Sequence, residues 1–459
     1  MLKLYNTYSN SLEEFKPIEE NKVKMYVCGP TVYDRAHLGH ARCYITWDVL
    51  YRYLKFLGFD VTYARNVTDI DDKILKKADN NNVEPEKIAK EFYNSYINSM
   101  NELNVLKPDI EPFATKTLGE MISMVKELVN KGYAYEIDND VYFEVSKFKN
   151  YGKLSKQPID DLMAGARVEA DNKKRSPLDF ALWKKDELHG INCPWGKGRP
   201  GWHIECSAMI RKHLGKTIDI HAGGADLQFP HHENEIAQSE CANGVKFVNY
   251  WLHNGFVTIN KEKMSKSLNT IDDLLKTHNS NTIRFFILTN HYRMPVEFND
   301  EALNSAKAGA SRLINSISNA SFTDEKDEES IEEFKNAMND DLNTSRALAV
   351  LFSLVDKFKK TNEIKFANTI KLLGETLGFD FSKKELSDDE LKEKILPLYE
   401  KFGFDEKVCS KEVLDEILKQ RQEARLNKDW AKSDLIRDEL TLIGVTIKDS
   451  KDGSSWEIA

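Results

Sequence analysis

Two short runs of mostly apolar, β-favouring residues near the start of the chain are each followed by apolar residues at helical spacing. The first run covers 23–27, and the helical pattern after it covers 41–57. The second run covers 60–67, and a helical stretch follows from Lys73. These patterns predict strand, helix, strand and helix in turn. Such a βαβ unit favours a parallel sheet, whose ligands bind at the carboxyl ends of the strands.

The middle of the chain interrupts this pattern with a segment of different character. From about 132 to 197 the residues form short alternating runs, such as 134–137 and 141–145, with many turn residues after them. We therefore predict an insertion with β structure inside one α/β domain. The α/β pattern then resumes with a predicted helix over 201–214, a strand over 217–221 and a helix that Pro230 opens.

The last third of the sequence is helical and rich in charge. Beyond about 303 it carries an acidic, loop-like segment at 324–329, and a separate unit begins near 401. A chain of 459 residues exceeds what one hydrophobic core usually serves. The fold class we predict is α/β: a doubly wound, Rossmann-like parallel-sheet domain split by an insertion, then a helical bundle and a small C-terminal domain.

Composition narrows the class of protein. No stretch approaches the ~18 apolar residues of a membrane span, and the first ten residues lack a secretory signal, so we expect a cytoplasmic protein without a membrane partner. A net charge of −9 gives no overall basic field for nucleic acid, although local patches can act against that average. Scattered cysteines in such a chain argue against disulfides and favour metal binding or chemistry. They are Cys28, Cys43, Cys193, Cys206, Cys241 and Cys409.

Two motifs carry groups suited to phosphate. The segment His37-Leu38-Gly39-His40 lies where a predicted strand gives way to a helix, a position where imidazoles and backbone N–H groups favour an anion. The segment Lys263-Met264-Ser265-Lys266-Ser267 places two lysines among small hydroxyl residues, as in a loop that closes on polyphosphate. Taken singly, the first also fits two surface histidines beside a turn, and the second fits a solvated basic loop.

A third set of residues has metal-ligand chemistry. Cys28 ends a predicted strand, Cys206 lies in a predicted helix, and His231 and Glu235 are four residues apart on one helix face. Cysteine, histidine and carboxylate are zinc ligands. The helical zinc motif of metalloproteases is excluded, because it would need histidine where Ile236 stands. Spacing alone leaves both a metal site and a group of satisfied interior residues open.

The two phosphate motifs, in this order, resemble the paired HIGH and KMSKS signatures of class I aminoacyl-tRNA synthetases, with Leu38 in place of isoleucine. The resemblance implies attack of an amino-acid carboxylate on the α-phosphate of ATP, in which charge builds on phosphorus and on the leaving pyrophosphate. It assigns ATP binding to His37, Gly39, His40 and Lys266, with Mg²⁺ accompanying ATP. The implied catalytic residues are His37, His40, Lys263 and Lys266.

A closer resemblance is to the cysteinyl-tRNA synthetases, whose sequence blocks are similar in chain order to 25–34, 66–73, 198–209 and 221–235. It implies one zinc ion per chain, and its substrates and partners are L-cysteine, ATP and tRNA(Cys). We expect a monomer. There are two alternatives: a related enzyme that joins cysteine to an amino-sugar, and a relative without catalytic activity that binds zinc or tRNA. The implied zinc ligands are Cys28, Cys206, His231 and Glu235.

The same resemblance suggests a pocket for cysteine and leaves two other features open. Acidic residues after the second strand, Asp69, Asp71 and Asp72, fit a magnesium site or, as we prefer, the cap of the next helix. The remaining cysteines match no ligand position. Each of the predicted pocket residues can also have a purely structural role: Gly29, Thr31, Thr68, Trp202 and His221.

The C-terminal sequence indicates tRNA contact less directly. Basic residues recur every three to five positions from Arg421 to Arg437 and fit either a cationic helix face or a solvated helix, while Trp456 can stack on a base. The predicted domains follow the resemblance. They are the first half of the catalytic domain (1–131), a connective insertion (132–197), the second half (198–255), a KMSKS-bearing linking unit (256–305), a helical bundle (306–400) and an anticodon-binding domain (401–459).

Overall fold

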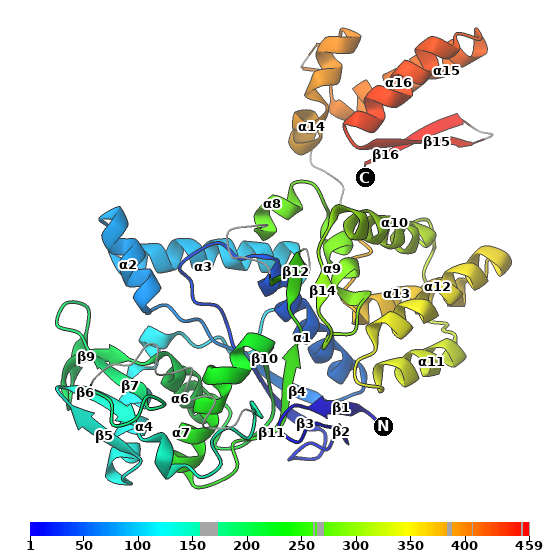
Figure 1. Cartoon of the computed structure of the whole chain (residues 1–459). Helices are drawn as coiled ribbons and strands as arrows, with labels where there is room; N and C mark the ends of the chain where they lie inside the picture. The colour runs from blue at the N-terminus through cyan, green and yellow to red at the C-terminus, as the bar shows by residue number, and fades with distance from the viewer. Residues whose placement is uncertain are drawn as a thin grey trace. The chain divides into compact units, whose positions relative to one another are not determined.

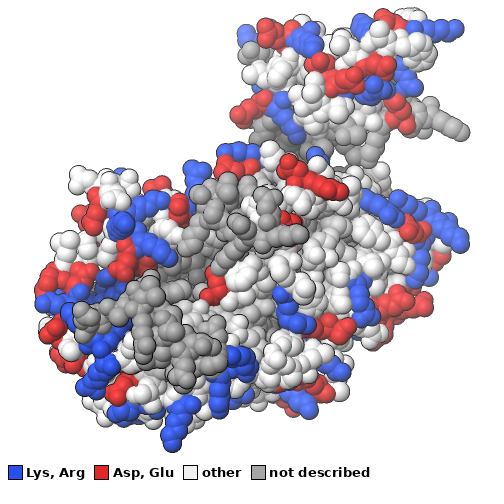
Figure 2. All heavy atoms as spheres, viewed as in Figure 1, with Lys and Arg blue, Asp and Glu red and all other residues white. Residues whose placement is uncertain are grey.

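The computed structural model describes residues 1–156, 173–259, 262–263, 270–382, 388–405, 407–450 and 453–458 (Figure 1). It consists of two compact units, 1–381 and 382–459. In the described residues no helix is both long and apolar enough to cross a membrane. On the face shown in Figure 2, acidic and basic side chains are interspersed over each unit, as the near balance of charge in the sequence implies.

A four-stranded parallel sheet forms the centre of the first unit. Its order is β11 (Val248–Asn254), β10 (Ile218–Gly224), β3 (Lys22–Val27) and β4 (Asp60–Arg65). The two strands predicted first, β3 and β4, are neighbours, and the chain crosses over between them through α1 (Leu38–Phe56). The predicted parallel-sheet α/β fold is confirmed.

Alternation along β3 sends its side chains into two different cores. Val23, Met25 and Val27 pack with α1 in the large core of the unit. Tyr26 and Cys28 point to the other face and share a second core with residues of α6 (Trp202–His213) and α7 (Glu233–Asn243). Since side chains of a strand alternate with period two, the register of β3 alone decides that Cys28 faces α6 and α7.

The predicted insertion is a five-stranded antiparallel sheet that lies, in chain order, between β4 and β10. Its strand order is β5-β6-β7-β9-β8, and its apolar residues form a separate core with α4 (Leu118–Asn130). The strands are β5 (Ala134–Ile137), β6 (Asp140–Phe143), β7 (Phe180–Lys185), β8 (Ile191–Cys193) and β9 (Gly196–Pro200).

The remaining elements of the first unit flank the sheet and extend the core of α1. Buried residues of α9 to α13 join that core, so the helical bundle packs on the catalytic sheet rather than standing alone. The helices are α2 (Asp72–Asn81), α3 (Pro85–Glu102), α8 (Ile271–Leu275), α9 (Ser280–Leu288), α10 (Asp300–Ser316), α11 (Glu328–Met338), α12 (Thr344–Thr361) and α13 (Ile364–Thr376). Short strands are β1 (Lys3–Asn6), β2 (Ser11–Glu14), β12 (Val257–Ile259), β13 (Glu262–Lys263) and β14 (Val296–Glu297).

The second unit begins nearer the N-terminus than the boundary at 401 expected from the sequence. Helix α14 (Asp388–Phe402) belongs to it, because Leu391, Ile395 and Leu398 share a core with Val413 and Leu414. The other elements are α15 (Ser410–Leu426), α16 (Trp430–Leu442), β15 (Val445–Ser450) and β16 (Gly453–Ile458).

Candidate active site

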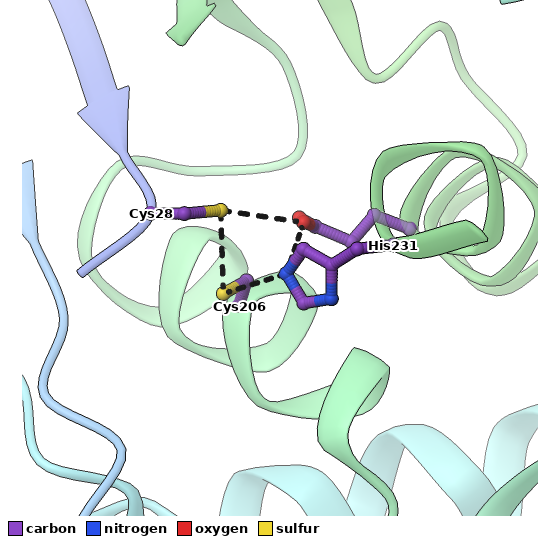
Figure 3. A group of neighbouring side chains, drawn as sticks. Cys28, Cys206 and His231 are labelled. Carbon is purple, nitrogen blue, oxygen red and sulfur yellow. Dashed lines mark hydrogen bonds and ion pairs between the residues drawn. The ribbon is translucent and has the colours of Figure 1, made fainter. Parts of the chain in front are cut away.

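Four predicted ligand residues, Cys28, Cys206, His231 and Glu235, lie together in the interior. One potential ligand atom from each falls within 4.8 Å of all the others, and all four side chains are buried. The two sulfur atoms are 3.9 Å apart, and Cys206 Sγ lies 3.6 Å from His231 Nε2 (Figure 3). His231 Nε2 is 3.0 Å from a carboxylate oxygen of Glu235. The structure therefore forms a compact donor set of the type that holds a metal ion.

Each member of this cluster comes from a different local structure. Cys28 follows the last residue of β3, and Cys206 lies in α6. His231 lies in a π-helical turn, Gln228–His232, that runs directly into α7, which carries Glu235. The expected helical spacing of His231 and Glu235 holds across this junction, and their side chains form an ion pair. Three chain segments far apart in sequence thus converge on one point.

Burial and mutual contact shift the titration of the cluster. Burial raises the pKa of the Cys28 thiol well above its usual value. Burial also opposes ionisation of Cys206, but hydrogen bonds with Cys28 and His231 outweigh it and lower the pKa of Cys206 to about 6. Burial opposes ionisation of Glu235 as well, but the charges of His221 and His231 outweigh it and lower the pKa of Glu235 to about 2. Burial likewise opposes protonation of His231, but the charge of Glu235 outweighs it and raises the pKa of His231 to about 10. Cys206 and Glu235 are therefore anionic donors beside the protonated imidazole of His231. Such a site suits a metal cation that takes the place of the imidazole proton.

A shell of histidines that the sequence analysis did not single out surrounds the cluster. His203 Nδ1 lies 2.9 Å from His231 Nδ1, so one ring donates to the other. His232 lies 3.3 Å from Cys28 Sγ through Nε2 and 2.8 Å from His253 through Nδ1. Hydrogen bonds to the second ring nitrogen fix the tautomer and orientation of a ligating imidazole. The adjacent histidines His231 and His232 were the sequence signal for this shell.

A second set of four donors overlaps the first. Cys28 and Glu235 also lie within 4.8 Å of ligand atoms of His221 and His232. His221 Nε2 is 2.9 Å from the other carboxylate oxygen of Glu235, and its ring stacks on Trp251. His221, predicted from the sequence as a pocket residue, therefore contacts the cluster directly.

The other predicted pocket residues lie around the same point. A side chain at Gly29 would place its Cβ 1.5 Å from the carbonyl oxygen of Asn66, so only glycine fits where these two loops cross. Thr31 pairs with Thr68 through a parallel β-bridge, and Thr68 donates to the buried carboxyl of Glu205 at 2.6 Å. The ring of Trp202 stacks on His231 with centroids 4.3 Å apart and is 39% exposed. Trp202 thus forms the exposed border of the cluster.

The two histidines of the HIGH motif cap the N-terminus of α1 through hydrogen bonds with the backbone of its first turn. His37 Nδ1 accepts from the N–H of Gly39, and the N–H of His37 donates to His40 Nδ1, each at 3.1 Å. Since both Nδ1 atoms accept, each neutral ring carries its proton on Nε2. A side chain at Gly39 would put its Cβ 2.9 Å from the His37 ring, which explains the glycine. The motif presents imidazole donors at a helix N-terminus, where phosphate binds favourably.

The segment that contains Lys266, and the side chain of Lys263, lie outside the described residues. The chain directly after it is described and lies against the HIGH motif. Thr270 forms a β-bridge with His37, and the N–H of Ile271 donates to Ala36 at 2.9 Å. The chain that follows the lysine motif is therefore a neighbour of the HIGH motif.

The acidic residues after β4 serve as caps and ion pairs. Asp69 accepts from the backbone and hydroxyl of Thr115, and Asp71 caps α2 by accepting from the N–H of Lys73. Asp72 pairs with Lys184 and Arg199 of the insertion. These contacts support the helix-cap interpretation over a magnesium site. All six cysteines are free of disulfide bonds.

Comparison with known proteins matches each part of the chain. Residues 14–308 match the family model described as "tRNA synthetases class I (C) catalytic domain". Residues 333–382 match a DALR domain, and residues 411–456 match a cysteinyl-tRNA ligase anticodon binding domain. Cysteine–tRNA ligases of Thermodesulfovibrio yellowstonii and Histophilus somni are 45% and 46% identical to the chain, over 100% and 99% of its length and 99% of theirs. The chain belongs to the cysteine–tRNA ligase family. It is accordingly a ligase of the class I aminoacyl-tRNA synthetases, with an anticodon-binding domain that implies tRNA binding.

Solved structures of another class I synthetase share the fold of this family member. Methionyl-tRNA synthetase of Mycobacterium tuberculosis bound by methionyl-adenylate has a TM-score of 0.58, covering 82% of this chain and 94% of that chain, at 13% identity. A second structure of that enzyme gives 0.56 at 14% identity, covering 78% and 89%. The likeness supports the catalytic fold.

The anticodon-binding domain of this family member pairs three of its basic residues with its own carboxylates. Both guanidinium Nη atoms of Arg421 bind Asp449, at 2.8 and 3.0 Å, and Arg425 binds the same carboxylate at 2.8 Å. Arg437 pairs with Asp434 and Asp438. These ion pairs favour a solvated, charge-paired helix over a continuous cationic face. Trp456 donates its indole N–H to Asp415 at 2.7 Å.

Proposed function

We propose that the chain activates L-cysteine with ATP and transfers it to tRNA(Cys), and that Cys28, Cys206, His231 and Glu235 hold one zinc ion that selects the substrate. The observation that carries the proposal is the placement of two chemistries on one loop. Cys28 and His37 both lie on the segment between β3 and α1, at the carboxyl end of the parallel sheet. A cysteine thiol and the α-phosphate of ATP can therefore be bound side by side, as adenylate formation requires.

The zinc proposal explains how cysteine is told from serine. When bound, zinc supplies a Lewis-acid centre that binds a thiolate far better than a hydroxyl and favours the deprotonated thiol. Cys206 and Glu235 provide the negative charge that holds such a cation, and His203 holds the ring of His231 in place. A site whose polar group lacks its proper partner can reject a near-isostere by roughly 10⁴ to 10⁵ without editing.

The phosphate residues act on the other reactant. In the first step a carboxylate oxygen of cysteine forms a bond to the α-phosphorus of ATP, and the bond to pyrophosphate breaks. We assign Gly39 to ATP binding, and His37 and His40 both to ATP binding and to the charge that develops on its phosphates in the transition state. Lys263 and Lys266 are assigned to the charge that grows on the leaving pyrophosphate, with Mg²⁺ bound to ATP. In the second step a terminal ribose hydroxyl of tRNA attacks the carbonyl carbon and AMP leaves.

The remaining assignments follow from this scheme. Trp202 and His221 contact the proposed zinc ligands, and we propose that they form the cysteine pocket together with Gly29, Thr31 and Thr68. We propose a monomer, with the catalytic domain in two halves (1–131 and 198–255), an insertion (132–197), a linking unit (256–305) and a bundle, followed by the anticodon-binding domain. An amino-sugar acceptor is not favoured, because residues 411–456 match the anticodon binding domain of cysteinyl-tRNA ligases.

The purified protein is expected to carry about one zinc ion per chain, measured by metal analysis. Cys206→Ser should lose zinc affinity and cysteine activation together, because it removes the most acidic thiol of the first donor set. Zinc affinity should also fall at lower pH, since Cys28 and His231 must lose their protons to bind it.

The overlapping donor set provides a matched control. His232→Gln removes a donor from the second set while leaving the first complete, and should keep stoichiometric zinc. If His232→Gln abolishes zinc binding and Cys206→Ser does not, the metal lies in the second set and the proposed ligands are wrong.

A further inference from the structure

A buried arginine on the HIGH helix binds a single distant segment of the chain. Arg42, two residues after His40 in α1, is fully buried. Its guanidinium donates to the carbonyl oxygens of Ile287 at 2.9 Å, His291 at 3.2 Å, Tyr292 at 3.1 Å and Met294 at 2.7 Å. These acceptors all belong to the stretch 287–294 at the end of α9.

Fold stability alone does not account for this arginine. Arg42 forms no ion pair with a carboxylate in the described part of the chain, and burial lowers the pKa of its guanidinium to about 10. A buried cation without a counter-charge is costly, and apolar replacements of buried charges are often neutral or stabilising. An apolar side chain, however, cannot fix the positions of four carbonyl groups with one planar fork of donors.

The segment held by Arg42 supports the strand that leads to the lysine motif. The carbonyl of Tyr292 also accepts from the N–H of Gly255 at 2.8 Å, just before β12. Directly after the segment, β14 pairs with β12 in parallel, with Val296 opposite Val257. Strand β12 in turn pairs with β13, whose last residue is Lys263, the first residue of the motif. Hydrogen bonds thus run without a break from Arg42 to the start of the lysine motif.

A carboxylate also holds the same segment. Asp341, between α11 and α12, accepts from the hydroxyl of Tyr292 at 2.8 Å and from Nε of Arg293 at 2.7 Å. It also accepts from the N–H of Tyr5 at 2.8 Å. Asp341 and the next residue, Leu342, both have positive φ, of 56° and 55°. Such backbone is strained for these side chains and persists only where surrounding contacts impose it.

We propose that Arg42 and Asp341 are positioning residues for adenylate formation, because they hold the segment 287–294 and so fix the position of β12, the strand that leads into the lysine motif. This inference rests on the proposed role of the lysine motif. Neither residue touches substrate. Their contribution is made through the position of the polyphosphate-binding lysines in the transition state.

The test is a double-mutant cycle on the full-length, zinc-loaded enzyme, with the single-turnover rate of cysteinyl-adenylate formation as the readout. Arg42→Lys keeps the buried positive charge but replaces the planar fork with a single point. We expect it to slow this step by about 10- to 100-fold, the scale of an ångström of misplacement, with zinc content and cysteine dissociation constant unchanged. In a Lys266→Ala background the same change should cost less than about threefold, because the lysine through which it acts is absent.

A matched variant tests the second of these positioning residues. Asp341→Asn keeps an acceptor for Tyr5 and Tyr292, tolerates positive φ, and removes the charge that holds Arg293. It should show a smaller loss with the same dependence on Lys266. Arg284→Lys is the control, since that equally buried arginine binds Asp48 and the carbonyls of Leu103 and Leu377 instead. It should lower the melting temperature. The rate loss of the Arg284→Lys, Lys266→Ala double variant should equal the product of the two single losses, as expected for independent sites.

The outcomes separate this inference from the function on which it rests. If Lys266→Ala leaves adenylate formation unchanged, the proposed role of the lysine motif is wrong. If Lys266→Ala slows the step and Arg42→Lys multiplies with it as the Arg284 control does, the function stands and the positioning role is overturned. A loss of zinc or of cysteine binding in Arg42→Lys would also overturn it, because that pattern indicates a general structural defect.

Discussion

His40→Gln is expected to slow cysteinyl-adenylate formation by about 10²-fold or more, with little change in the dissociation constant for cysteine. The physical reason is that His40 is assigned to charge that grows only in the transition state, where removing one preorganised donor costs about 10²–10³ in rate. Single-turnover kinetics with labelled ATP measures the rate, and equilibrium titration measures cysteine binding.

Glutamine is chosen because it preserves the fold of the motif. The N–H of His37 donates to the His40 side chain, and glutamine is a usual side chain at this position of a helical capping box. His40→Ala would remove this acceptor as well as the imidazole, and the difference between the two variants gives the cost of the cap. Equal losses in rate and in ground-state cysteine binding by His40→Gln would contradict the assigned role.

Removal of residues 382–459 is expected to separate the two half-reactions. Residues 1–381 form a compact unit by themselves and contain the Cys/His/Glu donor cluster and both phosphate motifs. The fragment should keep cysteine-dependent pyrophosphate exchange within a few-fold of the intact chain. Transfer to tRNA should fall by orders of magnitude, because binding energy from the anticodon end positions the acceptor end for reaction.

A cut at 382 is a sharper design than a cut at 401. The latter would leave α14 attached without Val413 and Leu414, against which its apolar residues pack. A melting curve of the fragment provides the folding control. If the folded fragment charges tRNA as well as the intact chain, the role of the second unit in tRNA binding is wrong.

The sequence predicted the catalytic sheet well because its signal is local. Runs of β-favouring residues and helical spacing each depend on a few neighbouring positions, and β3, β4 and α1 follow them closely. The boundary of the second unit was harder to predict from the sequence. The apolar spacing of α14 shows that one face is buried, but not which core buries it, and Leu391 and Ile395 join the later helices.

The site was predictable in part, for a similar reason. Residue type and spacing left the metal cluster open, and the family resemblance brought Cys28 and Cys206 together across 178 positions of sequence. The histidine shell was missed because His253, on β11, reaches His232 only through the order of the strands. The roles of Arg42 and Asp341 were equally hidden, since their contacts arise from tertiary packing and carry no motif.

The most direct test of the central claim is X-ray absorption at the zinc edge of the enzyme with and without bound L-cysteine. The proposed ligands include two cysteines, so the free enzyme should show two sulfur neighbours and the complex three, since the substrate thiolate joins them. L-serine should leave the count at two. A sulfur count that does not change when cysteine binds would contradict the account, because selection of the substrate would then not depend on the metal.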